Sequence, residues 1–150
     1  MRCAILFMAL ALVHFVLDRL CLKLIGDGEV VLIRGVLGLR HIENTGAAFG
    51  LFSSSAALAS IFSGALIVLM LAFVLFGRMN PAARLCLTAA LTGGACNLYM
   101  RIFYSAVNDW IELKFMDYPL FNFADICVCV GAVLFAVFYL FTKDGAKDAS

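Results

Sequence analysis

The sequence predicts an all-α membrane protein with four transmembrane helices and a small extracytoplasmic β-strand segment. Hydrophobic residues make up 65% of the 150 residues and charged residues only 14%, and the mean hydropathy is +1.05. An ordinary soluble domain does not have this composition. Four apolar stretches approach the roughly 20 helical residues that cross a hydrocarbon core. We place these helices at about residues 3–22, 56–76, 82–103 and 125–141.

The first apolar stretch resembles a cleavable secretion signal only at its start, where Arg2 precedes it. A small-x-small cleavage site does not follow, and Asp18, Arg19 and Lys23 interrupt its far end. We therefore expect a retained membrane helix.

The two longer connections are expected outside the membrane. Residues 26–55 contain two short β-branched or apolar runs, Glu29–Ile33 and Val36–Ile42, which predict two strands. Residues 104–124 carry Trp110, Tyr118 and Phe121, aromatic residues typical of a membrane interface. We find no internal repeat and expect a single domain over residues 1–150, with a disordered tail at 143–150.

Basic residues orient the predicted helices. Excess Lys and Arg mark cytoplasmic loops, and here they flank the short turn between the second and third helices and lie at both termini (Arg2, Arg78, Arg84, Lys143 and Lys147). Both termini are therefore expected in the cytoplasm, although four basic residues fall on the other side (Arg19, Lys23, Arg34 and Arg40).

Two aspartates are conspicuous: Asp125 opens the fourth apolar stretch, and Asp109 lies in the segment before it. Placing a carboxylate at the end of a membrane helix costs free energy, so we interpret these residues as functional. The 125 − 109 = 16 residues between them can fold back so that the two side chains meet. Desolvation and mutual repulsion raise carboxyl pKa values, so such a pair shares a proton and performs acid/base chemistry. The alternatives are a solvated loop residue for Asp109 and a helix N-cap for Asp125.

Two small-residue segments are further candidates for a site. Asn44-Thr45-Gly46-Ala47-Ala48-Phe49-Gly50 allows close backbone approach beside an amide side chain. Gly93-Gly94-Ala95-Cys96-Asn97 does the same within the third helix. For each segment, simple helix packing is the competing interpretation.

In combination, these motifs resemble the lipoprotein signal peptidase (signal peptidase II) family. The likeness rests on Asp18 with the basic residues after it, the Asn44–Gly50 segment, Gly93-Gly94 with Asn97 and Arg101, Asn108-Asp109-Trp110, and Phe121-Asn122-Phe123-Ala124-Asp125. It implies a bacterial inner-membrane aspartic endopeptidase that cuts prolipoproteins on the amino side of a diacylglyceryl-modified cysteine. It further implies an active site at the outer face, with external strands forming a cradle.

The resemblance also assigns roles to residues. Asp109 and Asp125 correspond to the catalytic pair. The remaining candidates bind substrate or support the site (Asn44, Gly46, Asn97, Arg101, Asn122, Asp18 and Lys23). The expected partners are diacylglyceryl-modified prolipoproteins, membrane lipids and globomycin-type inhibitors, and we expect a monomer.

The third-helix motif departs from the family pattern. It is one residue shorter, and Met100 stands where an aspartate is typical, which leaves Arg101 to bind lipid phosphate or pair with an acid such as Glu112. A one-residue deletion turns a helix face by about 100°. A catalytically inactive lipoprotein- or lipid-binding relative is therefore the alternative, and a proton-coupled carrier is disfavoured because the acids lie at one membrane face.

We expect no metal, no organic cofactor and no nucleic acid. His14 and His41 stand alone in the sequence, so neither belongs to a recognisable metal-binding set. The net charge is only +1, without a basic patch interleaved with aromatic residues.

Overall fold

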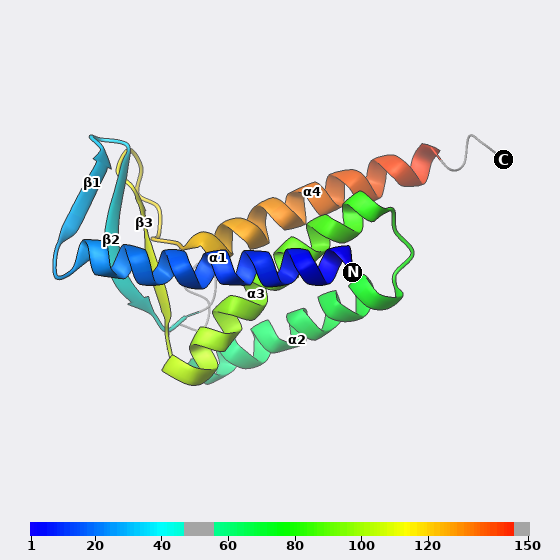
Figure 1. The fold of residues 1–150 in the computed structure, drawn as a ribbon, viewed down its shortest axis with the longest axis horizontal. Coiled ribbons are helices and arrows are strands. Elements are labelled where there is room, and N and C mark those ends of the chain that lie inside the picture. Colours follow the sequence, from blue (N-terminus) through cyan, green and yellow to red (C-terminus); the bar gives the residue numbers. More distant parts are fainter. Residues whose placement is uncertain (47–55, 146–150) are drawn as a thin grey trace.

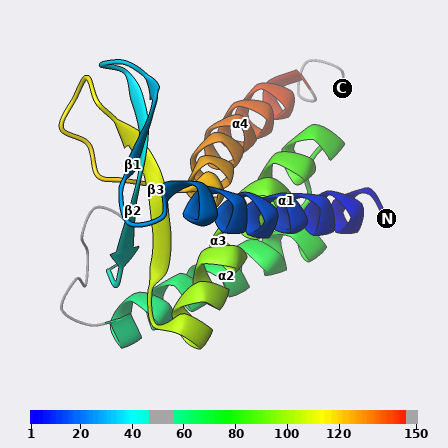
Figure 2. The same ribbon diagram turned by 60° about the vertical axis from the view of Figure 1, so that its left-hand side comes forward.

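The computed structural model describes residues 1–46 and 56–145, which form four helices and a three-stranded antiparallel sheet (Figure 1). In chain order the elements are α1 (Arg2–Ile25), β1 (Glu29–Ile33), β2 (Leu37–Asn44), α2 (Ala56–Phe76), α3 (Pro81–Tyr104), β3 (Val107–Leu113) and α4 (Phe123–Gly145). The sheet lies across the end of the bundle where α1 ends and α4 begins, and the N-terminus lies at the other end (Figure 2).

The helices fall where the apolar stretches predicted them, with α1 and α4 each longer than expected. α4 continues through Gly145, so the predicted disordered tail begins too early at residue 143, and residues 146–150 lie outside the described part. By length and composition, Arg2–Ile25 and Phe123–Phe141 are able to span a membrane, and Ser60–Phe76 is a shorter apolar helix. Of the four predicted spans, two therefore meet this test among the described residues.

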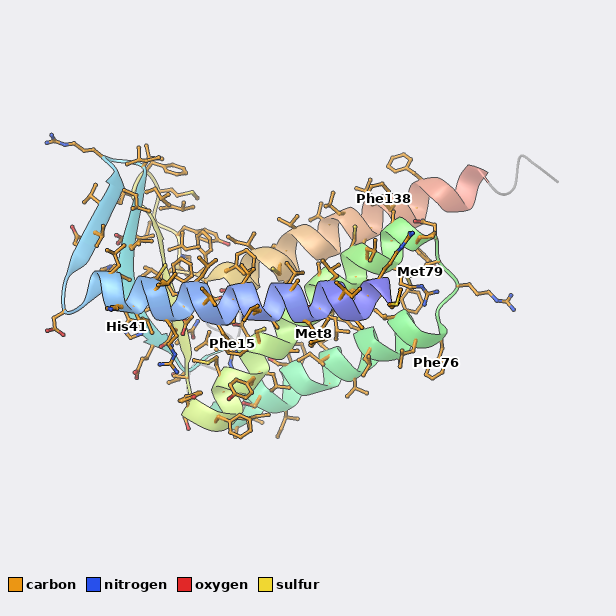
Figure 3. All side chains as sticks on the ribbon, viewed as in Figure 1. Met8, Phe15, His41, Phe76, Met79 and Phe138 are labelled. Atoms are coloured by element: carbon orange, nitrogen blue, oxygen red, sulfur yellow. The ribbon has the colours of Figure 1, made fainter. Side chains whose placement is uncertain are left out.

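The apolar side chains of these helices face outward. Only 11% and 17% of the residues in the spanning windows of α1 and α4 are buried, whereas the core helix of a soluble protein is mostly buried. Met8, Phe76 and Phe138 project from the outer faces of α1, α2 and α4 (Figure 3). Such an exterior is suited to lipid.

α3 is the central helix, in contact with α1, α2 and α4. It begins at an Asn80 N-cap, whose side chain accepts a hydrogen bond from the Ala83 amide, with Pro81 in the first turn. Close packing against α4 depends on glycine. A Cβ atom on Gly93 would lie 2.2 Å from the Ala124 carbonyl oxygen, and one on Gly131 would lie 2.6 Å from the Ala90 nitrogen.

The sheet has the order β1-β2-β3, and its third strand was not predicted. The interpretation of residues 104–124 as an aromatic interface segment is wrong for Trp110, which is 5% exposed and packs with Ile25 and Leu39. β3 alternates between two faces, one carrying Asn108 and Trp110 and the other Val107 and Asp109. A seven-residue strand is not stable in isolation. Residues 107–113 therefore adopt a strand because they pair with β2.

Candidate active site

Asp109 comes from the middle of β3 and is 2% exposed. Its strand partner on β2 is Ile42, so Asn44 is its diagonal neighbour on the same face. Asn44 Nδ2 donates to Asp109 Oδ2 at 2.8 Å, while Asn44 Oδ1 accepts from the Gly46 amide at 2.9 Å. The short turn after β2 therefore fixes which end of the Asn44 amide faces the carboxylate.

Asp125 lies in the first turn of α4, but it is not the N-cap. Asn122 holds that position. Its side-chain Oδ1 accepts from the Asp125 backbone amide at 3.1 Å, and the Asn122 backbone amide donates to Asp125 Oδ2 at 2.9 Å. This reciprocal arrangement is a capping box. It satisfies free amides at the start of α4 and holds the Asp125 carboxylate in a defined position at the helix end.

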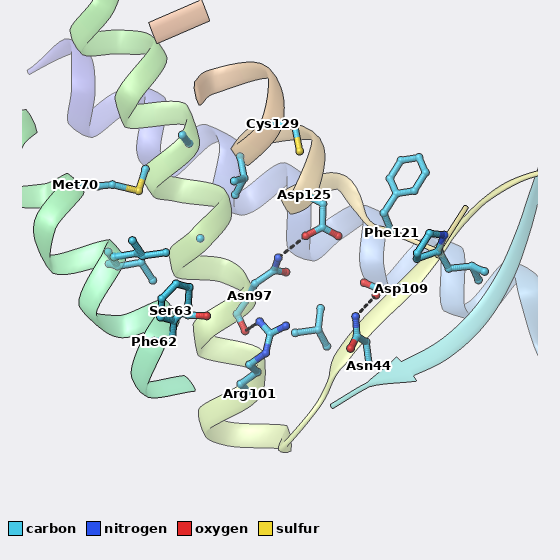
Figure 4. A pocket seen from close by; sticks show the side chains of 18 of the residues that line it. Asn44, Phe62, Ser63, Met70, Asn97, Arg101, Asp109, Phe121, Asp125 and Cys129 are labelled. Atoms are coloured by element: carbon cyan, nitrogen blue, oxygen red, sulfur yellow. Dashed lines mark hydrogen bonds between the residues drawn. The ribbon is translucent and has the colours of Figure 1, made fainter. Parts of the chain in front are cut away.

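Asn122 joins the two aspartates. Its Nδ2 donates to Asp109 Oδ1 at 2.8 Å and also lies 3.2 Å from Asn97 Oδ1. Asn97 Nδ2 in turn donates to Asp125 Oδ1 at 2.7 Å (Figure 4). All four carboxylate oxygens thus accept a hydrogen bond, and two amide side chains complete a connected network that includes both acids.

Arg101 brings a buried positive charge to this network from the last turn of α3. Its Nη2 donates to the Gly46 carbonyl at 2.6 Å and its Nη1 to the Asn97 carbonyl at 3.4 Å. The charges of Asp109 and Asp125 both act on the guanidinium. Its Nε has no partner among the described residues. Glu112, the alternative partner considered for Arg101, instead pairs with Arg40 and Lys114.

The surroundings of Asp109 raise its pKa and so favour its protonated form. Burial raises the pKa of Asp109 from 3.8 to about 6, and the nearby Asp125 charge acts in the same direction. Hydrogen bonds from Asn44 and Asn122 and the charge of Arg101 oppose this shift. Burial therefore outweighs the donors, and the carboxyl group holds a proton more readily than a solvated aspartate does.

A cavity of about 280 Å³ connects the polar network to an apolar wall. Its polar lining includes Asn44, Asn97, Arg101, Asp109 and Asp125 (Figure 4). The opposite wall comes from α2 and α4, with Phe62, Ser63, Leu66, Ile67, Met70 and Cys129. The sequence did not predict this wall, because an apolar membrane helix carries no periodic signal for the face that lines a site.

Asp18 and Lys23 lie away from the cavity. Asp18, 3% exposed on α1, accepts a hydrogen bond from Asn108 Nδ2 at 3.1 Å, on the face of β3 opposite Asp109. Lys23 is exposed on the last turn of α1. Of the predicted residues, the structure thus brings together Asn44, Gly46, Asn97, Arg101, Asp109, Asn122 and Asp125. Residues 47–50 of the first motif lie outside the described part.

The altered third-helix motif still supplies its side chains to the site. α3 is one uninterrupted helix, and Gly93, Asn97 and Arg101 recur at four-residue spacing on one face. Met100 is buried and is not among the cavity residues. The shorter motif left the orientation of Gly93 and Gly94 relative to Asn97 open. In the structure Asn97 bonds to Asp125 and Arg101 bonds to Gly46, so both side chains reach the site.

The fold is shared with two solved proteins, each described as a bacterial membrane enzyme studied by the in meso method. One gives a TM-score of 0.82 at 19% identity over 97% of this chain and 90% of that one. The other gives 0.78, also at 19% identity, over 91% and 90%. The architecture of this chain, four helices crossed at one end by a small sheet, is therefore a fold that these solved proteins share.

Sequence comparison is more specific. The family model for signal peptidase (SPase) II matches residues 10–141. Lipoprotein signal peptidase of Clostridium acetobutylicum is 37% identical over 126 residues, covering 80% of each chain. That of Syntrophomonas wolfei is 38% identical over 120 residues, covering 78% of this chain and 76% of the relative. The chain belongs to the signal peptidase II family, and is thus a protease of lipoprotein processing.

Proposed function

We propose that the chain is an aspartic endopeptidase that cuts prolipoproteins on the amino side of a diacylglyceryl-modified cysteine, with Asp109 and Asp125 as its catalytic pair. One observation carries this proposal. Two carboxylates from different elements, Asp109 buried and Asp125 partly buried, bond to the same residue, Asn122, and line the same cavity. Neither acid has a salt bridge among the described residues, so ion pairing does not account for their burial.

The chemistry follows from two acids that hold one proton between them. The ionised carboxylate takes a proton from a water molecule while the water oxygen attacks the scissile carbonyl carbon. The protonated carboxyl group gives its proton to the carbonyl oxygen. The tetrahedral intermediate then collapses. The nitrogen leaves with the proton taken from water, and the second carboxylate recovers its proton from a hydroxyl group of the intermediate.

The surrounding polar residues hold this pair in place. Asn44, Asn97 and Asn122 donate to the carboxylates and fix their orientation. Arg101 offsets the negative charge of the pair and ties α3 to the Gly46 carbonyl after β2.

The substrate's lipid chains are expected along the apolar wall of α2. Phe62, Leu66 and Met70 line the cavity on that side, so a diacylglyceryl group that enters from the bilayer stays in apolar surroundings while the peptide meets the acids. Each buried methylene contributes about 0.8 kcal/mol. Affinity therefore depends on lipidation, and the same wall is the expected site for a globomycin-type inhibitor.

The membrane arrangement completes the proposal. All four helices span the bacterial inner membrane, with the sheet and both acids at the outer face and the termini in the cytoplasm. The separation of the sheet from the N-terminus along the bundle supports this arrangement (Figure 1), as does the placement of Arg78 and Arg84 at the end away from the sheet. The protein is expected to act as a single-domain monomer.

The test uses purified enzyme in detergent with a lipidated and a non-lipidated form of one precursor peptide. The parental protein should cleave only the lipidated form, between the cysteine and the residue before it, as mass spectrometry of both products will show. Asp109→Asn and Asp125→Asn should each abolish cleavage while still unfolding in a single cooperative transition. Parental rates in both variants would refute the aspartic mechanism.

A further inference from the structure

A second chain of hydrogen bonds runs behind the carboxylate pair, on the opposite face of β3. His41 Nε2 lies 3.0 Å from Asn108 Oδ1, and Asn108 Nδ2 donates to Asp18 Oδ2 at 3.1 Å. An ionised carboxylate only accepts, so the Asn108 amide turns its nitrogen to Asp18 and its oxygen to His41. His41 Nε2 must therefore carry a hydrogen and donate it.

A β-bulge in β2 lies beside His41. Leu39 pairs with Ile111 and Ile42 with Asp109, so β2 has one residue more than β3 between these pairs. The extra residue falls at Arg40-His41, opposite Trp110. Bulges are common beside active sites. His41 lies in the sheet beside the end of α1 (Figure 3).

The two faces of this ladder carry matching diagonal pairs. On the cavity face, Asn44 is the diagonal neighbour of Asp109 and donates to it. On the rear face, Glu43 pairs with Asn108, so His41 is the diagonal neighbour of Asn108. Asn108 and Asp109 share a peptide bond, so a displacement of one moves the other.

Apolar packing alone does not fix this position. Trp110 packs with Ile25 and Leu39 and holds β3 against the end of α1, but burial is non-directional and tolerates sliding of the strand. The bonds of Asn108 to His41 and Asp18 have defined directions and lengths. The bond to Asp18 therefore fixes β3 relative to α1, and the bond to His41 adds a directional side-chain contact with β2 to the backbone ladder.

We propose that His41 is a positioning residue of the peptidase reaction, which acts on Asp109 through the Asn108 side chain and its anchor Asp18. This rests on the proposed function, in which Asp109 is one of the two catalytic acids. His41 touches neither the cavity nor the carboxylate pair. Its contribution is to hold the strand so that the Asp109 carboxylate stays in register with Asn122 and Asp125.

The experiment compares three variants of the full-length protein on the lipidated precursor. His41→Phe keeps a ring but removes the donor, and His41→Gln keeps a nitrogen donor near the Nε2 position. Arg40→Gln is the matched control, since Arg40 lies in the same bulge but pairs with Glu112 on a half-exposed surface. A shift of the carboxylate by about 1 Å costs on the order of 10²-fold in rate.

We expect His41→Phe to lower kcat by about 10- to 100-fold with KM within twofold of the parent. His41→Gln should recover most of the loss, and Arg40→Gln should match the parent. Added to Asn108→Ala, His41→Phe should cause no further loss, because both act through one amide. A parental kcat in His41→Phe, or independent multiplication of the two effects, would overturn the inference.

A second measurement is independent of catalysis. Trp110 is the only tryptophan and directly follows Asp109, so acrylamide quenching of its fluorescence reports the position of β3. Quenching should increase in His41→Phe and return to the parental value in His41→Gln. If Asp109→Asn retains activity but quenching follows this pattern, the proposed function fails while the structural part of the inference, that His41 holds β3 in position, stands. If quenching is unchanged in His41→Phe, His41 does not hold β3 in position, whatever the activity of that variant.

Discussion

The contact between Gly93 of α3 and the first turn of α4 provides the sharpest test of how the active site is held together. A Cβ atom added at Gly93 would lie 2.2 Å from the Ala124 carbonyl oxygen and 3.0 Å from two side-chain atoms of Cys127 and Val128. Ordinary contact begins at 3.4 Å, so Gly93→Ala must separate the helices by about 3.4 − 2.2 = 1.2 Å at this point. The blocking atom belongs to the backbone, so a rotamer change cannot relieve the clash.

That displacement falls on the hydrogen-bond network of the two aspartates. Asn97, one turn after Gly93, donates to Asp125 at 2.7 Å. A separation of about 1.2 Å takes this distance to about 3.9 Å, where a hydrogen bond no longer exists. Overpacking costs about 1–3 kcal/mol, while alanine gains about 1 kcal/mol over glycine within a helix. We therefore expect a folded protein whose kcat falls on the order of 10²-fold.

Two neighbouring glycines provide the controls. Gly94 lines the cavity, and a Cβ there would meet only the Ile67 side chain, at 3.4 Å. Gly94→Ala should therefore leave the helix spacing and kcat at their parental values and change KM at most. A Cβ on Gly131 would lie 2.6 Å from the Ala90 nitrogen, a similar clash but six residues beyond Asp125. Gly131→Ala should therefore lower the melting temperature more than it lowers kcat. The assay is cleavage of the lipidated precursor beside thermal unfolding in the same detergent. Equal activity of Gly93→Ala and Gly94→Ala would refute this reasoning.

The remaining predictions concern the acids and their shared cap. Removing either acid, by Asp109→Asn or Asp125→Asn, should lower kcat by at least about 10²- to 10⁴-fold, the range of a general acid or base, measured on the lipidated precursor. Because the pKa of Asp109 rises to about 6 on folding, the native state holds its proton more tightly, so its contribution to stability falls as pH rises from about 4 to 6. The free energy of unfolding should fall by an amount on the order of 3 kcal/mol over this pH range. Melting curves of Asp109→Asn should not show this fall. If the variant and the parent have the same pH dependence of stability, the raised pKa of Asp109 is contradicted. Asn122→Ser keeps a helix cap but loses the amide bond to Asp109, so kcat should fall with little loss of melting temperature. Asn122→Ala should additionally lose about 0.5–2 kcal/mol of stability, and equal melting temperatures for the two variants would count against the capping box.

Much of the candidate site was accessible from the sequence because membrane helices tolerate polar residues only where they are needed. Asp109 and Asp125 stood out against apolar surroundings. Three further residues were assigned to the site by the family resemblance (Asn97, Arg101 and Asn122), and the structure brings all five into one network. The cavity residues of α2 did not stand out, because every face of that helix is apolar. Asp18 and Lys23 were grouped with the site by resemblance, and neither lines the cavity.

The sequence alone determined the helical architecture, because about 20 apolar residues in a row leave the backbone no other way to satisfy its hydrogen bonds in lipid. The sequence also indicated which acids are functional candidates, because the free-energy cost of a carboxylate depends on the apolar residues next to it in the chain. Only the tertiary structure decided that Val107–Leu113 is a strand, that His41 bonds to Asn108, and that Asn122 rather than Asp125 caps α4. These features depend on partners that are distant in the chain or on distances of a few tenths of an ångström, and neither is encoded in local periodicity.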